Sequence, residues 1–281
     1  MLKNILVFLD GGEESQRGLP AAVNLAHLTD GRIRGLFVKK IELVEIGLLP
    51  PTPDLGTAPP VMLDPELLAT IEAEKDKTAR RLAEIFTGVI GPLSDGLQVV
   101  RGEVVEELIQ GSHTADLVVM GRNRLATGNR SDWLSDITRL VLKRSWAPIL
   151  LPGSKPSSLL HGPFLLAYDA SLAANRTLRQ LARLAALTKA AVTVLSVGPP
   201  ETTGPWLVEA HSYCKPYDLE LTLEAREGKA MEVIEAFSQE RSFSLIGLGA
   251  HGHFKLRDLV LGSSAEKMLH NLSQGFLVCA R

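Results

Sequence analysis

The segment Gly249–Ser264, GAHGHFKLRDLVLGSS, decides how the rest of the chain is interpreted. It follows a short apolar run, Phe243–Leu248, and it precedes apolar residues at helical spacing in Ala265–Leu272. The order predicts a strand, a glycine-rich loop and a helix in succession. Units of this kind, repeated along a chain, form a parallel sheet covered by helices on both faces.

The glycines of this segment predict a phosphate cradle at the end of the strand. Two residues separate Gly249 from Gly252, and nine separate Gly252 from Gly262. Glycines let backbone N–H groups approach an anion closely, and a helix that begins at Ser263 would direct free N–H groups at the same point. The loop also carries three basic side chains, His253, Lys255 and Arg257.

The same residues also have a purely structural interpretation. Ser263 followed by Glu266 matches a capping box, which a helix uses with or without a ligand. Glycines after a strand often form only a turn. The segment alone therefore leaves both interpretations open, and the rest of the chain has to decide between them.

Composition limits the function classes. The 281 residues are 45% apolar and 22% charged, as in a globular protein of one large or two ordinary domains. A net charge of −2 and 5% aromatics disfavour a nucleic-acid-binding surface. The two cysteines, Cys214 and Cys279, cannot build a disulfide framework and fit a reducing compartment. No signal peptide or membrane span is expected, so a cytoplasmic location is predicted.

The first half of the chain alternates strand and helix patterns. A proline-rich excursion, residues 41–65, interrupts the alternation. The alternation predicts a parallel sheet whose ligands lie beyond the carboxyl ends of the strands. Strands are predicted at Asn4–Leu9, Arg34–Val38, Leu97–Arg101, Asp116–Met120 and Pro148–Leu151, and helices at 16–28, 65–86, 104–111 and 134–144.

The second half repeats the first. A shift of 159 residues places Asp10 on Asp169, and a shift of 128 places Gly121 on Gly249. The order of the elements is kept, and Pro152–Ser158 has the composition of a linker. We therefore predict two tandem, doubly wound α/β domains, residues 1–153 and 160–281, each with a five-stranded parallel sheet and helices on both faces.

This pattern resembles the universal stress protein family over nearly the whole chain. The marks are the strand-end acids Asp10 and Asp169, the glycines Gly102 and Gly228 before the third helix of each half, and the Gly-x2-Gly-x9-Gly-Ser spacing of the second half. The resemblance implies a Rossmann-like fold of the adenine nucleotide alpha hydrolase type. It also implies an ATP-binding stress-response regulatory protein, with or without Mg²⁺ beside the ATP.

The resemblance also implies the ligand-binding residues and the assembly. Ala167 and Asp169 would face adenine and ribose, and Val197 would flank the base. The ribose and phosphates would be surrounded by Leu248, Gly249, Gly252, Gly262, Ser263 and Ser264. The two halves would pair through their last strands, 148–151 and 276–279, as an intramolecular pseudo-dimer. A further homodimer and a protein partner stay open.

The first half departs from the glycine pattern. Arg124 and Leu134 stand at the positions of the second and third glycines, and Asp136 follows Ser135. One interpretation is a scaffold that has lost nucleotide binding, with Arg124 paired to Asp10 as a plug. The other is a different anion site formed by Arg122, Arg124 and Arg130.

Other function classes find less support in the sequence. Gly247, Gly249 and Gly252 also match the dinucleotide pattern GxGxxG, but no acid follows at the next strand end, and no Walker motif occurs. His251, His253 and His270 lack further ligands for a metal, and Ser212 and Ser263 lack triad partners. No catalytic residue is predicted. A slow ATPase or nucleotidyl-transfer enzyme, and a structural partner-binding protein with an incidental nucleotide site, stay open as alternatives.

Overall fold

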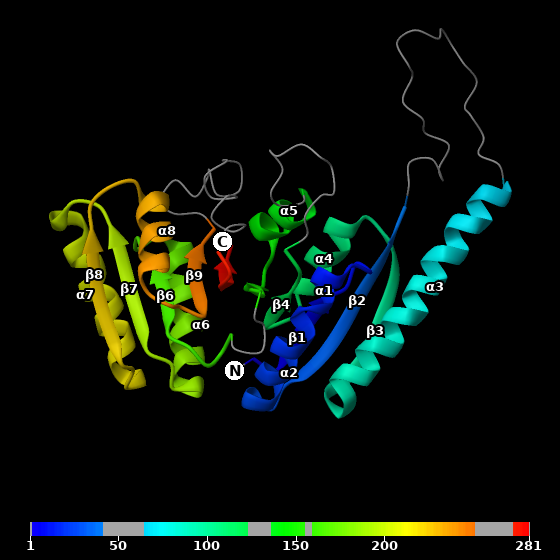
Figure 1. Ribbon diagram of the computed structural model, residues 1–281, viewed down its shortest axis with the longest axis horizontal. Coiled ribbons are helices and arrows are strands. Elements are labelled where there is room, and N and C mark those ends of the chain that lie inside the picture. Colours follow the sequence, from blue (N-terminus) through cyan, green and yellow to red (C-terminus); the bar gives the residue numbers. More distant parts are fainter. Residues whose placement is uncertain (1, 42–64, 123–135, 155–158, 251–271, 281) are drawn as a thin grey trace, which may run out of the picture.

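A computed structural model describes residues 2–41, 65–122, 136–154, 159–250 and 272–280. Its strands form one ten-stranded sheet in the order β3-β2-β1-β4-β5-β10-β9-β6-β7-β8 (Figure 1). Each half contributes five strands that are parallel to one another. The predicted α/β class, with five parallel strands in each half, is confirmed, and the strands of the two halves join into one continuous sheet.

The elements of the first half follow the predicted alternation, and their bounds differ from it in detail. The first predicted helix is two helices, and the helix after the excursion reaches Ile90. Residues 42–64 of the excursion lie outside the described part of the chain. The elements are β1 (Asn4–Phe8), α1 (Glu13–Gln16), α2 (Gly18–Thr29), β2 (Arg32–Lys40), α3 (Pro65–Ile90), β3 (Ser94–Gly102), α4 (Val104–Ser112), β4 (Leu117–Val119), α5 (Asp136–Arg144) and β5 (Ile149–Leu151).

The second half repeats this order without an excursion. Its second long helix, α7, starts directly after the glycine turn that ends the second strand. The elements are β6 (Phe164–Ala167), α6 (Leu172–Thr188), β7 (Val192–Val197), α7 (Pro200–Cys214), β8 (Leu221–Arg226), α8 (Ala230–Glu240), β9 (Leu245–Gly249) and β10 (Gly275–Cys279).

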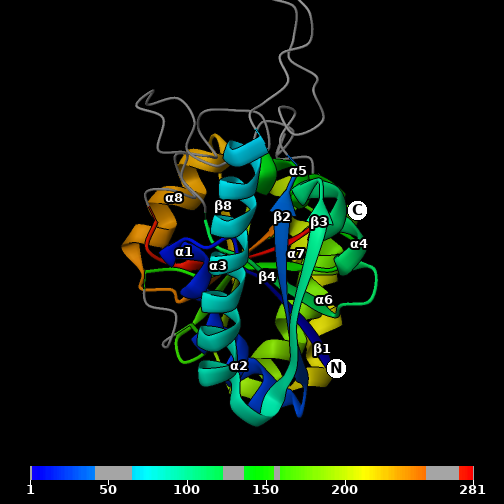
Figure 2. The ribbon, with the colours of Figure 1, turned by 90° about the vertical axis from the view of Figure 1, so that its right-hand side faces the viewer.

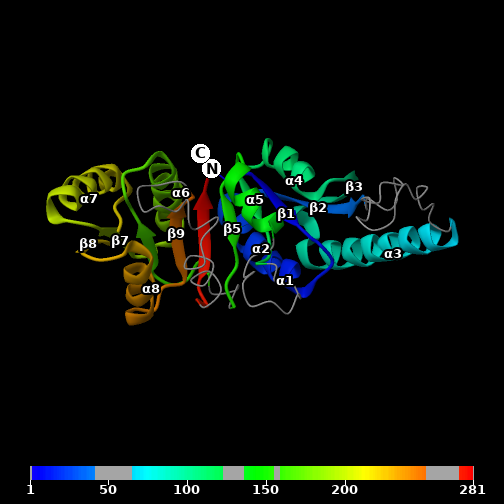
Figure 3. The same cartoon turned by 90° about the horizontal axis from the view of Figure 1, so that it is seen from above.

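The two halves join through their last strands. β5 and β10 are antiparallel, with Leu150 opposite Leu277 and Ile149 opposite Val278. These side chains are buried, so the expected pairing of the last strands is confirmed and leaves neither strand as an exposed edge. In Figure 3 the two strands lie side by side at the centre of the molecule.

Two buried layers sandwich the sheet. One apolar cluster joins α2, α3, α6 and α7 to one face, and the other joins α4, α5 and α8 to the opposite face. Successive strand residues alternate between the clusters, as the pleat requires: Ile5 and Val7 belong to the first, Leu6 and Phe8 to the second. Figure 2 shows α3 running along β2 and β3 at one end of the sheet. Within the described residues, no helix has the length and apolarity needed to cross a bilayer.

The helix that follows the first strand ends in the same backbone conformation in both halves. Asp30 follows α2 with φ 49°, and Lys189 follows α6 with φ 59°, so both adopt the left-handed conformation that favours glycine. The two positions are 159 residues apart, as the predicted duplication requires.

Replacing the exposed Lys189 with glycine should raise the free energy of unfolding by about 1 kcal/mol, because glycine avoids the Cβ clash at positive φ. Lys189→Ala is the matched control, since it removes the same charge but keeps a Cβ. Urea unfolding of the three proteins checks this. Equal stability of the glycine and alanine variants would contradict the explanation.

Candidate functional site

The predicted site residues of the second half that the structure describes meet at one edge of the sheet. Ala167 ends β6, Val197 ends β7, and Leu248 and Gly249 end β9. The sheet order places these strands side by side, as β9-β6-β7, with their carboxyl ends together. Asp169 follows two residues after β6. Gly252, Gly262, Ser263 and Ser264 lie outside the described residues.

Asp169 is built into the turn that starts α6. Its carboxylate Oδ1 accepts a hydrogen bond of 3.1 Å from the backbone N–H of Ser171, and Ala170 between them has φ 56°. The side chain of Ser171 then caps the helix by accepting from the N–H of Ala174 at 3.2 Å. Asp169 as a whole is 1% exposed. This role of Asp169 in stabilising the turn before α6 was not predicted from the sequence.

The first half contains the same turn. Oδ1 of Asp10 accepts from the N–H of Gly12 at 2.9 Å, and the intervening Gly11 has φ 94°. The equivalence of Asp10 and Asp169, predicted from the 159-residue shift, therefore extends to their hydrogen bonds. The signal that could have revealed this role was the pattern of an acid, a turn residue and a helix start in both copies.

Gly249 has a packing role that the sequence reasoning also missed. A Cβ at this position would lie 2.6 Å from the backbone nitrogen of Ala174, so only glycine lets β9 end against the first turn of α6. The hydroxyl of Thr177 on α6 completes this contact, 3.0 Å from the carbonyl oxygen of Leu248. Gly121 packs in the same way, with a Cβ position 2.8 Å from backbone atoms of Glu14.

Buried polar contacts hold the floor of this edge in place. The hydroxyl of Tyr168 donates to Oδ1 of Asn175 at 2.8 Å, and the hydroxyl of Ser196 donates to the carbonyl of Tyr168 at 2.8 Å. Burial raises the pKa of Tyr168, so the phenol stays protonated and remains a donor. The strand ends that carry Ala167 and Val197 are thereby fixed to each other and to α6.

The equivalent edge of the first half contains a cavity. Its volume is ≈ 460 Å³, and Asp10, Val38, Lys39, Lys40 and Lys75 are among its lining residues. Two of these lysines are already engaged: Lys39 pairs with Asp76, and Lys75 donates to the carbonyl of Lys40 at 2.8 Å. The predicted plug between Arg124 and Asp10 falls outside the described residues at Arg124, so it stays a prediction.

Arg122 contacts the second half of the chain, which does not support the alternative interpretation that it forms an anion site with Arg124 and Arg130. Its guanidinium turns to the other half, where it donates to the carbonyl of Leu272 at 2.8 Å and to that of Gln274, and lies 4.8 Å from the ring centre of Phe276. Burial lowers the pKa of Arg122 to about 10, and the carboxylate of Glu14 opposes this shift. Arg124 and Arg130 lie outside the described residues.

The described residues do not gather three or more His, Cys, Asp or Glu side chains that could hold a metal ion. The histidines His251, His253 and His270 fall outside this part of the chain.

Comparison with known proteins identifies the class to which this fold and edge belong. The model of the universal stress protein family matches residues 1–151 and 207–279. The chain therefore belongs to the universal stress protein family, a family of stress-response proteins. The resemblance inferred from the glycine spacing is confirmed.

Particular relatives extend the match to the full chain. Universal stress protein Slr1230 of Synechocystis sp. is 25% identical over 294 aligned positions, which cover 97% of this chain and 98% of that protein. A universal stress protein from Archaeoglobus fulgidus has a similar structure, with TM-score 0.74, 20% identity, and coverage of 99% of this chain and 98% of that one. One from Pseudomonas aeruginosa gives TM-score 0.57 at 18% identity, covering 99% and 93%.

Proposed function

We propose that this chain is a stress-response protein that binds ATP in its second half, residues 160–281. The supporting observation is the edge where β9, β6 and β7 end together. It presents Ala167, Asp169 and Val197 beside the strand from which the Gly-x2-Gly-x9-Gly-Ser segment continues. A nucleotide requires an acid for its ribose, apolar strand ends for its base and a glycine-rich loop for its phosphates.

Each residue has a role in this proposal. Ala167 and Val197 contact the adenine, and the carboxylate of Asp169 accepts a hydrogen bond from a ribose hydroxyl. Leu248 and Gly249 border the ribose. Gly252, Gly262, Ser263 and Ser264 surround the phosphates with backbone and hydroxyl donors. Mg²⁺, when bound, neutralises phosphate charge.

The proposal includes the assembly. The β5–β10 pairing supports an intramolecular pseudo-dimer of two domains, 1–153 and 160–281, in which the first domain is a scaffold. A cytoplasmic protein is proposed, with an adenine nucleotide as its small-molecule partner. The alternatives are a slow ATPase or nucleotidyl-transfer enzyme and a structural protein with an incidental nucleotide site.

One experiment separates these functions. The purified protein is denatured, its small molecules are identified by mass spectrometry, and ATP is then titrated by calorimetry into nucleotide-free protein. We expect one tightly bound ATP per chain and no steady product formation. Turnover with a defined product would favour the enzyme, and the absence of saturable ATP binding would favour the structural protein.

Replacing Asp169 with alanine should weaken ATP binding by about tenfold, because one charged acceptor for ribose is lost while the phosphate cradle stays. Asp169→Asn separates the two duties of this residue: it keeps an oxygen for the Ser171 N–H but removes the charge. Asp10→Ala, the equivalent change in the first half, should leave the affinity unchanged in calorimetry. An equal loss in both alanine variants would contradict the assignment of ATP to the second half.

A further inference from the structure

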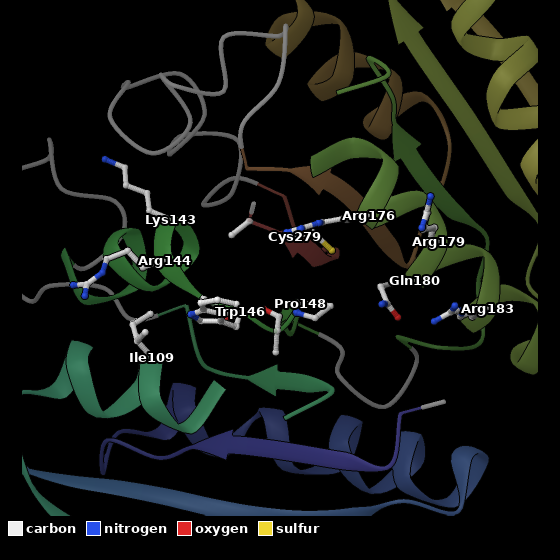
Figure 4. Close-up of a pocket in the computed structure, with 13 residues that line it drawn as sticks. Ile109, Lys143, Arg144, Trp146, Pro148, Arg176, Arg179, Gln180, Arg183 and Cys279 are labelled. Carbon is white, nitrogen blue, oxygen red and sulfur yellow. Dashed lines mark hydrogen bonds between the residues drawn. The ribbon is translucent and has the colours of Figure 1, made fainter. Parts of the chain in front are cut away.

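A groove of ≈ 1030 Å³ lies across the junction of the two halves, away from the proposed ATP site. One wall is the face of α6, and the other is the segment that leaves α5 and enters β5, while the end of β10 closes its floor (Figure 4). None of its lining residues is among the proposed ATP-binding residues. In the sheet, β9 lies between β10, at the floor of the groove, and β6, which ends at Ala167 two residues before Asp169.

The walls of the groove are strongly basic. Arg176, Arg179 and Arg183 all line it, and their spacing along α6 spreads three guanidinium groups over about 10 Å of the helix. The opposite wall contributes Lys143 and Arg144. The described lining residues include no carboxylate, so the positive charge is not neutralised from within the groove.

Three details show how much of this positive charge is available to a ligand. Arg144 is held by Glu106 through two hydrogen bonds of 2.7 and 2.9 Å, so its charge is largely balanced. Among the described residues, none of the three α6 arginines forms an ion pair with a carboxylate. Burial raises the pKa of the Cys279 thiol to about 11, so this floor residue adds no negative charge at neutral pH.

Two arginines of α6 are partly held in position by tyrosines of α7 and of the turn that follows it. The guanidinium of Arg179 lies 5.8 Å from the ring centre of Tyr213. The hydrogen bond with Tyr213, and next to it the Arg183 guanidinium, lower the pKa of Tyr217. Side chains held in this way lose less conformational entropy when a ligand binds.

Trp146 adds an aromatic surface to the opposite wall. Its side chain is 74% exposed, the highest value among the large apolar residues of the described chain. The ring of His113 meets it edge-on, with centroids 5.3 Å apart and an interplanar angle of 78°. One wall of the groove thus offers an exposed indole while the other offers three guanidinium groups (Figure 4).

We propose that this groove binds a ligand that carries a chain of phosphates. Guanidinium groups form bidentate hydrogen bonds with phosphate oxygens, and three of them in succession match a chain of charges better than a single anion. The two walls and the apolar floor suit a small ligand rather than a folded partner. The chain of phosphates is either free or the tail of a nucleotide, whose base would stack on Trp146.

The test uses inorganic tripolyphosphate as the probe, titrated by calorimetry at fixed ionic strength. We expect saturable binding that weakens about 100-fold when Arg176, Arg179 and Arg183 are all replaced by glutamine, because several charge-assisted hydrogen bonds are lost. The matched control replaces Lys77, Arg80 and Lys229, which lie on other surfaces, by glutamine. It removes the same net charge and should change the affinity less than about twofold.

The source of the phosphates is decided with nucleotides. In a Gly252→Arg background, which removes the proposed ATP site, ATP is titrated with and without Trp146→Ala. Weaker ATP binding in the alanine variant, with tripolyphosphate unaffected, identifies a nucleotide. If ATP and tripolyphosphate bind with equal affinity, and Trp146→Ala changes neither affinity, the ligand is a free phosphate chain.

Three results would overturn the proposal: no saturable tripolyphosphate binding, equal loss in the arginine and control variants, or displacement of tripolyphosphate by an oligoglutamate peptide that binds more tightly. The last result would make the groove a docking site for an acidic protein segment. Tripolyphosphate binding does not require Gly252, so failure of this proposal and failure of the ATP proposal are distinguishable.

Discussion

Substitution of Gly252 by arginine should abolish ATP binding at the proposed site of the second half, so the tight binding phase should disappear from the calorimetric titration. The change introduces the residue type that the first half carries at the equivalent position, Arg124. A long side chain there would occupy the space that the phosphate chain needs between the glycines. An affinity loss of 1,000-fold or more is expected, since the phosphates provide most of the charged contacts.

A neighbouring glycine provides the control for folding. Gly249→Ala should destabilise the protein by about 3 kcal/mol, because the new Cβ would meet the backbone of α6 at 2.6 Å. Gly252→Arg should leave the urea midpoint close to that of the unchanged protein. Loss of ATP binding with a native midpoint supports the site, whereas unchanged ATP affinity in Gly252→Arg would refute it.

The second large effect is expected for substitution of Arg122, which should lower the stability of the protein. Arg122→Leu should lower the free energy of unfolding by about 3 kcal/mol, because the partly buried carbonyl groups of Leu272 and Gln274 lose a charged donor. Arg122→Lys keeps the charge but not the planar fork, so it should recover only part of the loss. Urea unfolding followed by tryptophan fluorescence and circular dichroism measures both.

The position of Arg122 also predicts how unfolding changes. It links the strand end of β4 to the segment before β10, so its loss weakens the contact between the halves. We expect the two spectroscopic transitions to separate in Arg122→Leu, as the halves unfold less cooperatively. Arg80→Leu, an exposed change on α3, should shift stability by no more than about 0.5 kcal/mol. A loss of the same size in both variants would contradict the bridging role.

Local patterns were enough to predict the architecture. Continuous apolar runs that end in Asp10 and Asp169 marked buried parallel strands, and their spacing revealed the duplication. The meeting of Ala167, Val197 and Leu248 at one edge followed from the rule that parallel strands end together. These predictions succeeded because the alternation of strands and helices leaves few topologies.

Contacts between distant segments could not be predicted in the same way. The role of Gly249 depends on how closely α6 approaches β9. The contacts of Arg122 with the second half could not be predicted, because nothing local shows where a long side chain turns. Trp146 and the α6 arginines lie 30 or more positions apart in the sequence and meet only through the β5–β10 junction. The periodicity of apolar residues describes a single helix or strand. These contacts depend on how two elements pack against each other.

The β5–β10 junction has a consequence for how such a chain can change over evolutionary time. In an assembly of two identical chains, every substitution appears twice, so one binding site cannot be lost while its partner is kept. Here the paired strands belong to one polypeptide, and the two halves are always present in equal number and at high effective concentration. One half is then free to diverge, as the glycine-to-arginine difference between Gly252 and Arg124 illustrates, while the other continues under its own selection.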